Sequence, residues 1–185
     1  MRYVEAGSGQ PIICLQSGAG LQLSRALELL SRTFRVVAFE LPASGTSPAE
    51  DLARTVNAAL AELGIERYSV LAFGPHARAG LWMAIERPHA VDAIVLSAPL
   101  DALEPRAAEL AHPVLVLFGT AEEEAALEDA HRYRELLQNG HVMMVYNASR
   151  AIEADRPEAF ASVAGDFLLR KAEFVVNLAS ALLHP

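Results

Sequence analysis

The feature that most constrains the fold is the alternation of short apolar segments with segments of helical spacing along most of the chain. The apolar segments predict strands, at Tyr3–Glu5, Ile12–Leu15, Arg35–Glu40, Tyr68–Leu71, Val91–Leu96, Val114–Phe118 and His141–Tyr146. The segments between them predict helices, at Leu21–Ser31, His76–Glu86, Leu127–Gln138 and Pro157–Leu169, with one more beginning at Ser47. Such alternation predicts an α/β fold, with a doubly wound, mostly parallel sheet flanked by helices.

The helix that begins at Ser47 has the clearest sequence limits. Ser47-Pro48-Ala49-Glu50 has the pattern of a capping box, with proline at the first helical position and glutamate three residues after the cap. Its apolar face consists of Leu52, Val56, Leu60 and Leu63. Gly64 follows, and glycine commonly ends a helix.

Composition favours one globular domain over residues 1–185. The chain is 52% hydrophobic and 21% charged, which is typical of a folded protein. A net charge of −8 without a basic stripe disfavours nucleic acid and anionic membrane surfaces as partners. The single cysteine, Cys14, lies in a predicted strand and is expected in the core. Without a leader or membrane-spanning run in the sequence, we expect a cytoplasmic protein.

The segment Ala72-Phe73-Gly74-Pro75-His76 lies between a predicted strand and a predicted helix that ends at Arg87-Pro88. With the strand that follows, this run resembles the nucleophile elbow of the α/β-hydrolase superfamily, where G-x-S-x-G presents a serine above the sheet. Counting back from Pro88 places Gly74 in the serine position. The serine and both flanking glycines of the motif are therefore replaced.

The resemblance extends over nearly the whole chain. The second and third strands of the superfamily are similar to MRYVEAGSGQPIICLQ, and its fourth strand with the turn after it is similar to RVVAFELPASGTSP. The segment that carries the catalytic acid is similar to PVLVLFGTAEEE. The segment that carries the catalytic histidine is similar to VMMVYNASRAIEADRPEAF. The resemblance implies that the first strand is missing. It also implies that no substrate cap is inserted between Pro99 and Val114, so we expect a lidless member.

The resemblance implies that the catalytic positions are degenerate. Gly74 in the nucleophile position has no side chain to attack with, and Arg150 in the histidine position stays protonated and cannot act as a base. Glu122 takes the position of the acid. Pro75 lacks the N–H that normally completes the oxyanion hole. Glu122 and Arg150 could form an ion pair in the old active site, or each could point to solvent.

Other candidate binding residues lie near the elbow. His76, in the first turn after it, could bind a ligand or act as a base, with its pKa lowered by the helix N-terminus, or it could pack locally. Ser17 and Gly18 lie in the loop that corresponds to the oxyanion loop, where Ser17 could hydrogen-bond a ligand or serve the turn. The remaining histidines have no metal-ligand spacing, so we predict neither a metal nor a cofactor.

Two functions fit these residues. The first is a non-catalytic binding or partner protein that keeps the hydrolase scaffold, with a small apolar ligand near Gly74. The alternative is a non-standard enzyme of the same fold, a hydrolase, lyase or isomerase, that uses His76 with Glu122 or Arg150. The scaffold alone does not decide between them.

Residues 171–185 form an apolar C-terminal tail. Phe174, Val175, Leu178, Leu182 and Leu183 would form one apolar stripe on a helix. The stripe could dock on its own domain or pack against the same tail of a second copy. We expect a homodimer, because an isologous dimer needs only one such patch.

Overall fold

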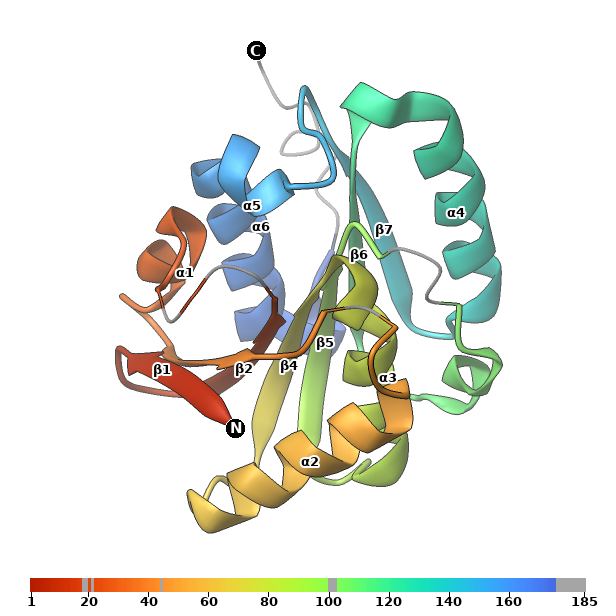
Figure 1. Cartoon of the computed structure of the whole chain (residues 1–185). Coiled ribbons are helices and arrows are strands. Elements are labelled where there is room, and N and C mark those ends of the chain that lie inside the picture. Colours follow the sequence, from red (N-terminus) through yellow and green to blue (C-terminus); the bar gives the residue numbers. More distant parts are fainter. Residues whose placement is uncertain (18–19, 21, 44, 100–102, 176–185) are drawn as a thin grey trace.

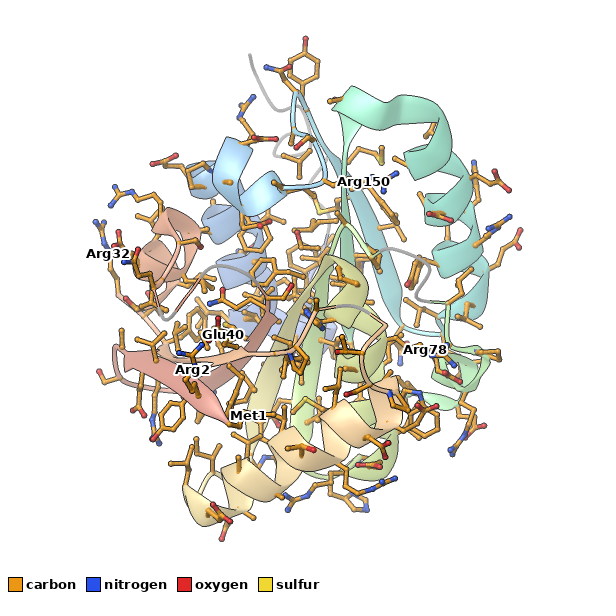
Figure 2. The ribbon with its side chains drawn as sticks, viewed as in Figure 1. Met1, Arg2, Arg32, Glu40, Arg78 and Arg150 are labelled. Carbon is orange, nitrogen blue, oxygen red and sulfur yellow. The ribbon has the colours of Figure 1, made fainter. Side chains whose placement is uncertain are left out.

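The computed structural model describes residues 1–17, 20, 22–43, 45–99 and 103–175, and its centre is a seven-stranded sheet (Figure 1). The strands lie in the order β1-β3-β2-β4-β5-β6-β7. They are β1 (Arg2–Ala6), β2 (Pro11–Gln16), β3 (Arg35–Glu40), β4 (Tyr68–Phe73), β5 (Val91–Ser97), β6 (Val114–Gly119) and β7 (Gly140–Val145). Only β1 pairs antiparallel, and a salt bridge of 2.5 Å between Arg2 and Glu40 joins it to β3 (Figure 2). The predicted mostly parallel sheet is confirmed.

Helices cover both faces of this sheet. The α-helices are α1 (Arg25–Leu30), α2 (Ala49–Glu62), α3 (Ala77–Glu86), α4 (Glu123–Leu136), α5 (Ile152–Asp155) and α6 (Pro157–Arg170). Short 3-10 helices are η1 (Gly74–His76), η2 (Pro105–Glu109), η3 (Thr120–Glu122) and η4 (Lys171–Glu173). Apolar residues of α2, α3 and α4 pack on one face, and those of α1, α5 and α6 pack on the other.

Alternation along β2 shows how one strand serves both cores. Ile13 and Leu15 belong to the core under α2 and α3, whereas Ile12 and Cys14 belong to the core under α1 and α6. All four side chains are buried, as expected for a strand covered on both faces. Burial also raises the pKa of the Cys14 thiol, so Cys14 is the inert core residue that the sequence predicts.

Two of the predicted helices differ by several residues from those observed. The predicted helix Leu21–Ser31 begins only at Arg25, because the Ser24 hydroxyl accepts a hydrogen bond from the Leu27 N–H at 3.4 Å and caps the helix. The predicted helix Leu127–Gln138 instead spans Glu123–Leu136. Its first turn is acidic, so apolar spacing does not reveal where the helix begins.

The predicted capping box at Ser47 is wrong. Helix α2 begins at Ala49 with Pro48 as its N-cap residue, and no described side chain makes a cap hydrogen bond there. Pro48 has an extended ψ of 145°, which puts Ser47 outside the cap position. The other end is as predicted, because Gly64 follows the helix with a φ of 68°.

The described part of the C-terminal tail packs on its own domain. Lys171 Nζ lies 3.1 Å from an Asp92 carboxylate oxygen, and the buried Phe174 ring makes edge contacts with Phe167 and His141. Phe174 and Val175 are not helical, so the predicted helical stripe does not begin at Phe174. The rest of the predicted stripe lies outside the described residues. None of the helices described here is long and apolar enough to cross a membrane.

Candidate functional site

A sharp turn at the carboxyl end of β4 forms the centre of the candidate site. Gly74 follows the strand with a φ of 51°, and η1 then leads into α3. This conformation is costly for residues with a β-carbon and is freely accessible to glycine. A β-carbon built on Gly74 would meet no atom within 4 Å. The turn therefore faces open space where a larger residue would place its side chain.

That space belongs to a pocket of about 320 Å³, which we call the elbow pocket. It lies where the carboxyl ends of β2, β4 and β5 meet the chain before α5. Ligands of parallel α/β sheets usually bind at this carboxyl edge. Its lining consists of Gln16, Ser17, Ser24, Phe73, Gly74, Pro75, Ala98, Arg150, Ala151 and Glu153. Five of these residues are apolar, and the other five have polar or charged side chains.

The elbow pocket brings together three of the residues proposed from sequence: Ser17, Gly74 and Arg150. Gly18 lies outside the described residues. Glu122 ends η3, and its side chain is not among those described. The backbone nevertheless runs close to the Arg150 loop, because the Ala121 N–H donates to the Ala148 carbonyl at 3.0 Å. An ion pair between Glu122 and Arg150 stays a prediction.

His76 faces a different pocket. It lines a second hollow together with Arg78, and among the described residues only Pro75 is common to both linings. Arg78 on α3 and Arg150 before α5 lie well apart (Figure 2). The His76 side chain is buried, and burial lowers the pKa of its imidazole. The predicted direction of this shift is confirmed, and its cause is desolvation of the imidazole.

Glu153 is a pocket residue that the sequence analysis missed. Burial raises the pKa of its carboxyl, and the nearby Asp155 carboxylate shifts it in the same direction. The buried Ser97 hydroxyl lies near Glu153 but has no partner at hydrogen-bond geometry within the described ranges. Next to it, Ala98 lines the pocket with a strained φ of 44°. The signal for Glu153 in the sequence was its position as an acidic residue three positions after Arg150. Its helix is too short to show hydrophobic periodicity.

Asp155 orders the loop that carries Arg150. The Ser149 hydroxyl and N–H donate to the same Asp155 oxygen at 2.6 and 2.8 Å. These two hydrogen bonds lower the pKa of the Asp155 carboxyl, so the contact persists at neutral pH. The Arg150 backbone is therefore anchored on one side of the pocket by its own neighbours.

A buried carboxylate holds the short connection between β5 and β6. Glu104 Oε2 accepts hydrogen bonds from Arg78 Nε and Trp82 Nε1, both at 3.0 Å. The Arg106 guanidinium lies 5.3 Å from the centre of the Trp82 ring. The described part of this connection contains only η2, in agreement with the predicted lack of a cap domain.

Comparison with solved structures settles the fold. A predicted CIB-like hydrolase from Thermoplasma acidophilum matches with a TM-score of 0.74 at 16% identity, covering 90% of each chain. The chain has the α/β-hydrolase fold. A carboxylesterase of Bacillus subtilis matches with a TM-score of 0.74 at 16% identity, covering 90% of this chain and 86% of that one. An esterase of Thermogutta terrifontis matches with a TM-score of 0.74 at 12% identity, covering 94% of both.

Sequence comparison adds no finer assignment to the α/β-hydrolase fold. No protein-family model matches the chain, and no curated protein matches it in sequence. At identities this low the structural likeness shows the fold alone, so the chemistry has to be argued from the pocket. Among the described residues, no group of three or more histidine, cysteine or acidic side chains could hold a metal ion.

Proposed function

We propose that this α/β-hydrolase-fold protein binds a small, mostly apolar molecule in the elbow pocket and does not act as a serine hydrolase. The observation that carries the proposal is Gly74, which has a positive φ and open space beside it in the pocket. The turn has the shape needed to present a nucleophile but has no side chain to present. The space that a serine would occupy is left for a ligand.

The neighbouring residues support binding without serine-based catalysis. We assign Gly74 to the nucleophile position, Glu122 to the acid position and Arg150 to the histidine position of the fold. Arg150 lines the pocket but cannot accept a proton at any working pH. Pro75 has no N–H to donate to an oxyanion. Each of these losses alone would impair acyl transfer.

Glu153 favours a second candidate function, a non-standard enzyme of the same fold. A carboxyl whose pKa is raised by burial, beside a buried hydroxyl, is a typical acid–base group. It is better placed for this role than His76, since it lines the elbow pocket and His76 lines the other one.

The proposal is tested by screening small aromatic and aliphatic compounds for thermal stabilisation. A ligand at a hundred times its Kd should add about 2.7 kcal/mol to the stability. Ala151→Phe would fill the elbow pocket and should abolish the stabilisation. Ala154→Phe, also exposed but outside the lining, is the matched control. A ligand that stabilises the Ala151→Phe variant as well as the wild type would overturn the proposal. Turnover that Glu153→Gln abolishes would favour the enzyme.

We also propose that the protein is a cytoplasmic homodimer that associates through the apolar residues of the tail. Light scattering should show twice the chain mass for the full chain and one chain mass after truncation. The truncation belongs after Val175, because Lys171 and Phe174 contact the domain and their removal would disturb it. A monomeric full chain, or a truncated chain that stays dimeric, would contradict this interface.

A further inference from the structure

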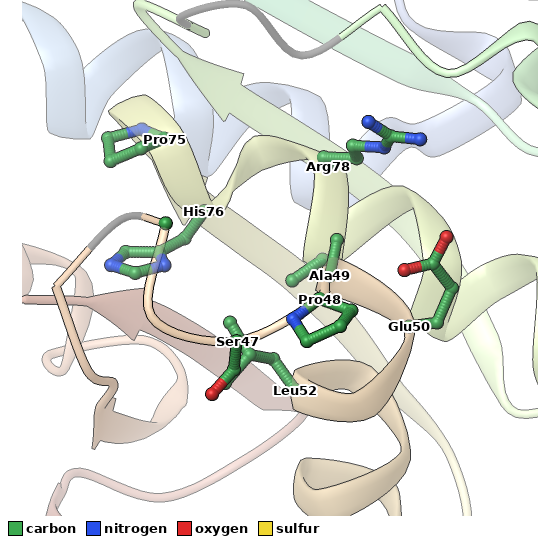
Figure 3. Close-up of a pocket in the computed structure, with 10 residues that line it drawn as sticks. Ser47, Pro48, Ala49, Glu50, Leu52, Pro75, His76 and Arg78 are labelled. Atoms are coloured by element: carbon green, nitrogen blue, oxygen red, sulfur yellow. The ribbon is translucent and has the colours of Figure 1, made fainter.

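The pocket that contains His76 is the larger of the two at the elbow and has a volume of about 510 Å³ (Figure 3). We call it the α2–α3 pocket, because the first turns of these two helices and the segments that lead into them form its wall. Its lining consists of Gly45, Ser47, Pro48, Ala49, Glu50, Leu52, Pro75, His76, Arg78 and Ala79. Of the residues that the structure describes, it shares only Pro75 with the elbow pocket, so a ligand here would occupy a separate site.

The N-terminus of α2 presents uncapped N–H groups at this pocket. The N-cap residue is Pro48, and no side chain in the described ranges makes a cap hydrogen bond. The Leu52 N–H donates to the Pro48 carbonyl at 3.1 Å, which is the first hydrogen bond of the helix. The N–H groups of residues 49–51 therefore have no acceptor within the helix. With 14 residues in the helix, the positive end of its dipole lies at the same place.

His76 gives an independent sign of a missing partner. The side chain is only 2% exposed, and its buried Nε2 atom has no hydrogen-bond partner within the part of the chain that the structure describes. Leaving such an atom unpaired costs about 1–3 kcal/mol. Because burial lowers the pKa of the imidazole, the ring is neutral at pH 7 and can donate from one nitrogen.

Arg78 adds a fixed cation to the same lining. Its Nε and Nη2 atoms each lie 3.0 Å from Glu104, which fixes the guanidinium while leaving the side chain partly exposed. The Ser47 hydroxyl is a further potential donor. Glu50 is the one carboxylate among the described lining residues and opposes these groups. Figure 3 shows it on the Arg78 side of the pocket, away from His76.

We infer that the α2–α3 pocket binds a small oxyanion, the carboxylate or phosphate group of a ligand. Uncapped helix amides, a hydroxyl and an unpaired imidazole are donors that such a group would satisfy together, and the Arg78 guanidinium adds positive charge on the other side of the pocket. The chain's net charge of −8 gives no long-range attraction for an anion. Recognition therefore depends on these short-range contacts.

The experiment is an NMR titration of the uniformly ¹⁵N-labelled full chain with inorganic phosphate and, separately, acetate. We expect saturable shifts at the backbone amides of Ala49, Glu50 and Asp51, and at the His76 ring nitrogens. Glu50→Gln removes the opposing carboxylate and should tighten binding about two- to fivefold. Glu62→Gln, at the far end of the same helix, is the matched control and should leave the affinity unchanged.

Both anions are informative. Binding of phosphate or of acetate supports the site, and their ratio identifies the preferred group. The inference is overturned if the α2 amides show no saturable shift with either anion. It is also overturned if Glu50→Gln binds no more tightly than Glu62→Gln. Shifts confined to Ser17 and Gly74 would place the anion in the elbow pocket. The anion site can therefore be disproved without disproving the function proposed for the elbow pocket.

Discussion

Gly74→Ser alone should leave the protein without esterase activity. A serine in this position would have the backbone turn of a nucleophile but no base, because Arg150 lines the same pocket and cannot take its proton. Pro75 would still provide no N–H for the oxyanion. Members of a catalytic triad act as a unit, and losing the serine or the histidine alone costs on the order of 10⁶ in turnover.

Release of p-nitrophenol from short-chain esters, together with labelling by a fluorophosphonate, measures this result. The matched variant carries Gly74→Ser, Pro75→Ala and Arg150→His together, which replaces the nucleophile, the missing N–H and the base. Turnover above buffer should need all three changes. Activity or covalent labelling in the single Gly74→Ser variant would show that the catalytic positions are wrongly assigned.

Gly119→Ala should destabilise the protein by more than about 3 kcal/mol, enough to unfold a marginally stable domain. Gly119 ends β6, and a β-carbon there would lie 2.1 Å from the Ala148 carbonyl oxygen and 2.3 Å from that of Ser149. Both contacts are with backbone atoms, which cannot move away as the end of a flexible side chain could. The close approach also keeps the loop of Arg150 next to η3.

Urea unfolding followed by circular dichroism measures the loss of stability. Gly64→Ala is the control, because a β-carbon there meets no atom within 4 Å but the residue has a φ of 68°. That variant should lose only about 1–2 kcal/mol, the cost of a left-handed conformation. Equal losses in the two variants would refute the steric argument.

The sequence by itself was sufficient for the architecture. Apolar strands separated by amphipathic helices predict a covered parallel sheet because backbone groups must be paired and apolar faces buried, whatever the chemistry of the site. The elbow could be located for a similar reason. A glycine between a strand and a helix that begins with proline satisfies a turn with positive φ, and Gly74 has that conformation.

Only the tertiary structure decided which side chains share a pocket. Gly74 and His76 are two positions apart, but they line different pockets because the chain turns into a helix between them. Glu153 lies far along the chain from Gly74 and enters the elbow pocket only because α5 packs above the sheet edge. The local pattern around Ser47 was misleading, since Pro48 takes the N-cap position and leaves the α2 amides uncapped. Hydrophobic periodicity in the sequence indicates which face of a helix or strand is buried. Which loops lie next to one another depends instead on packing between elements that are distant in sequence.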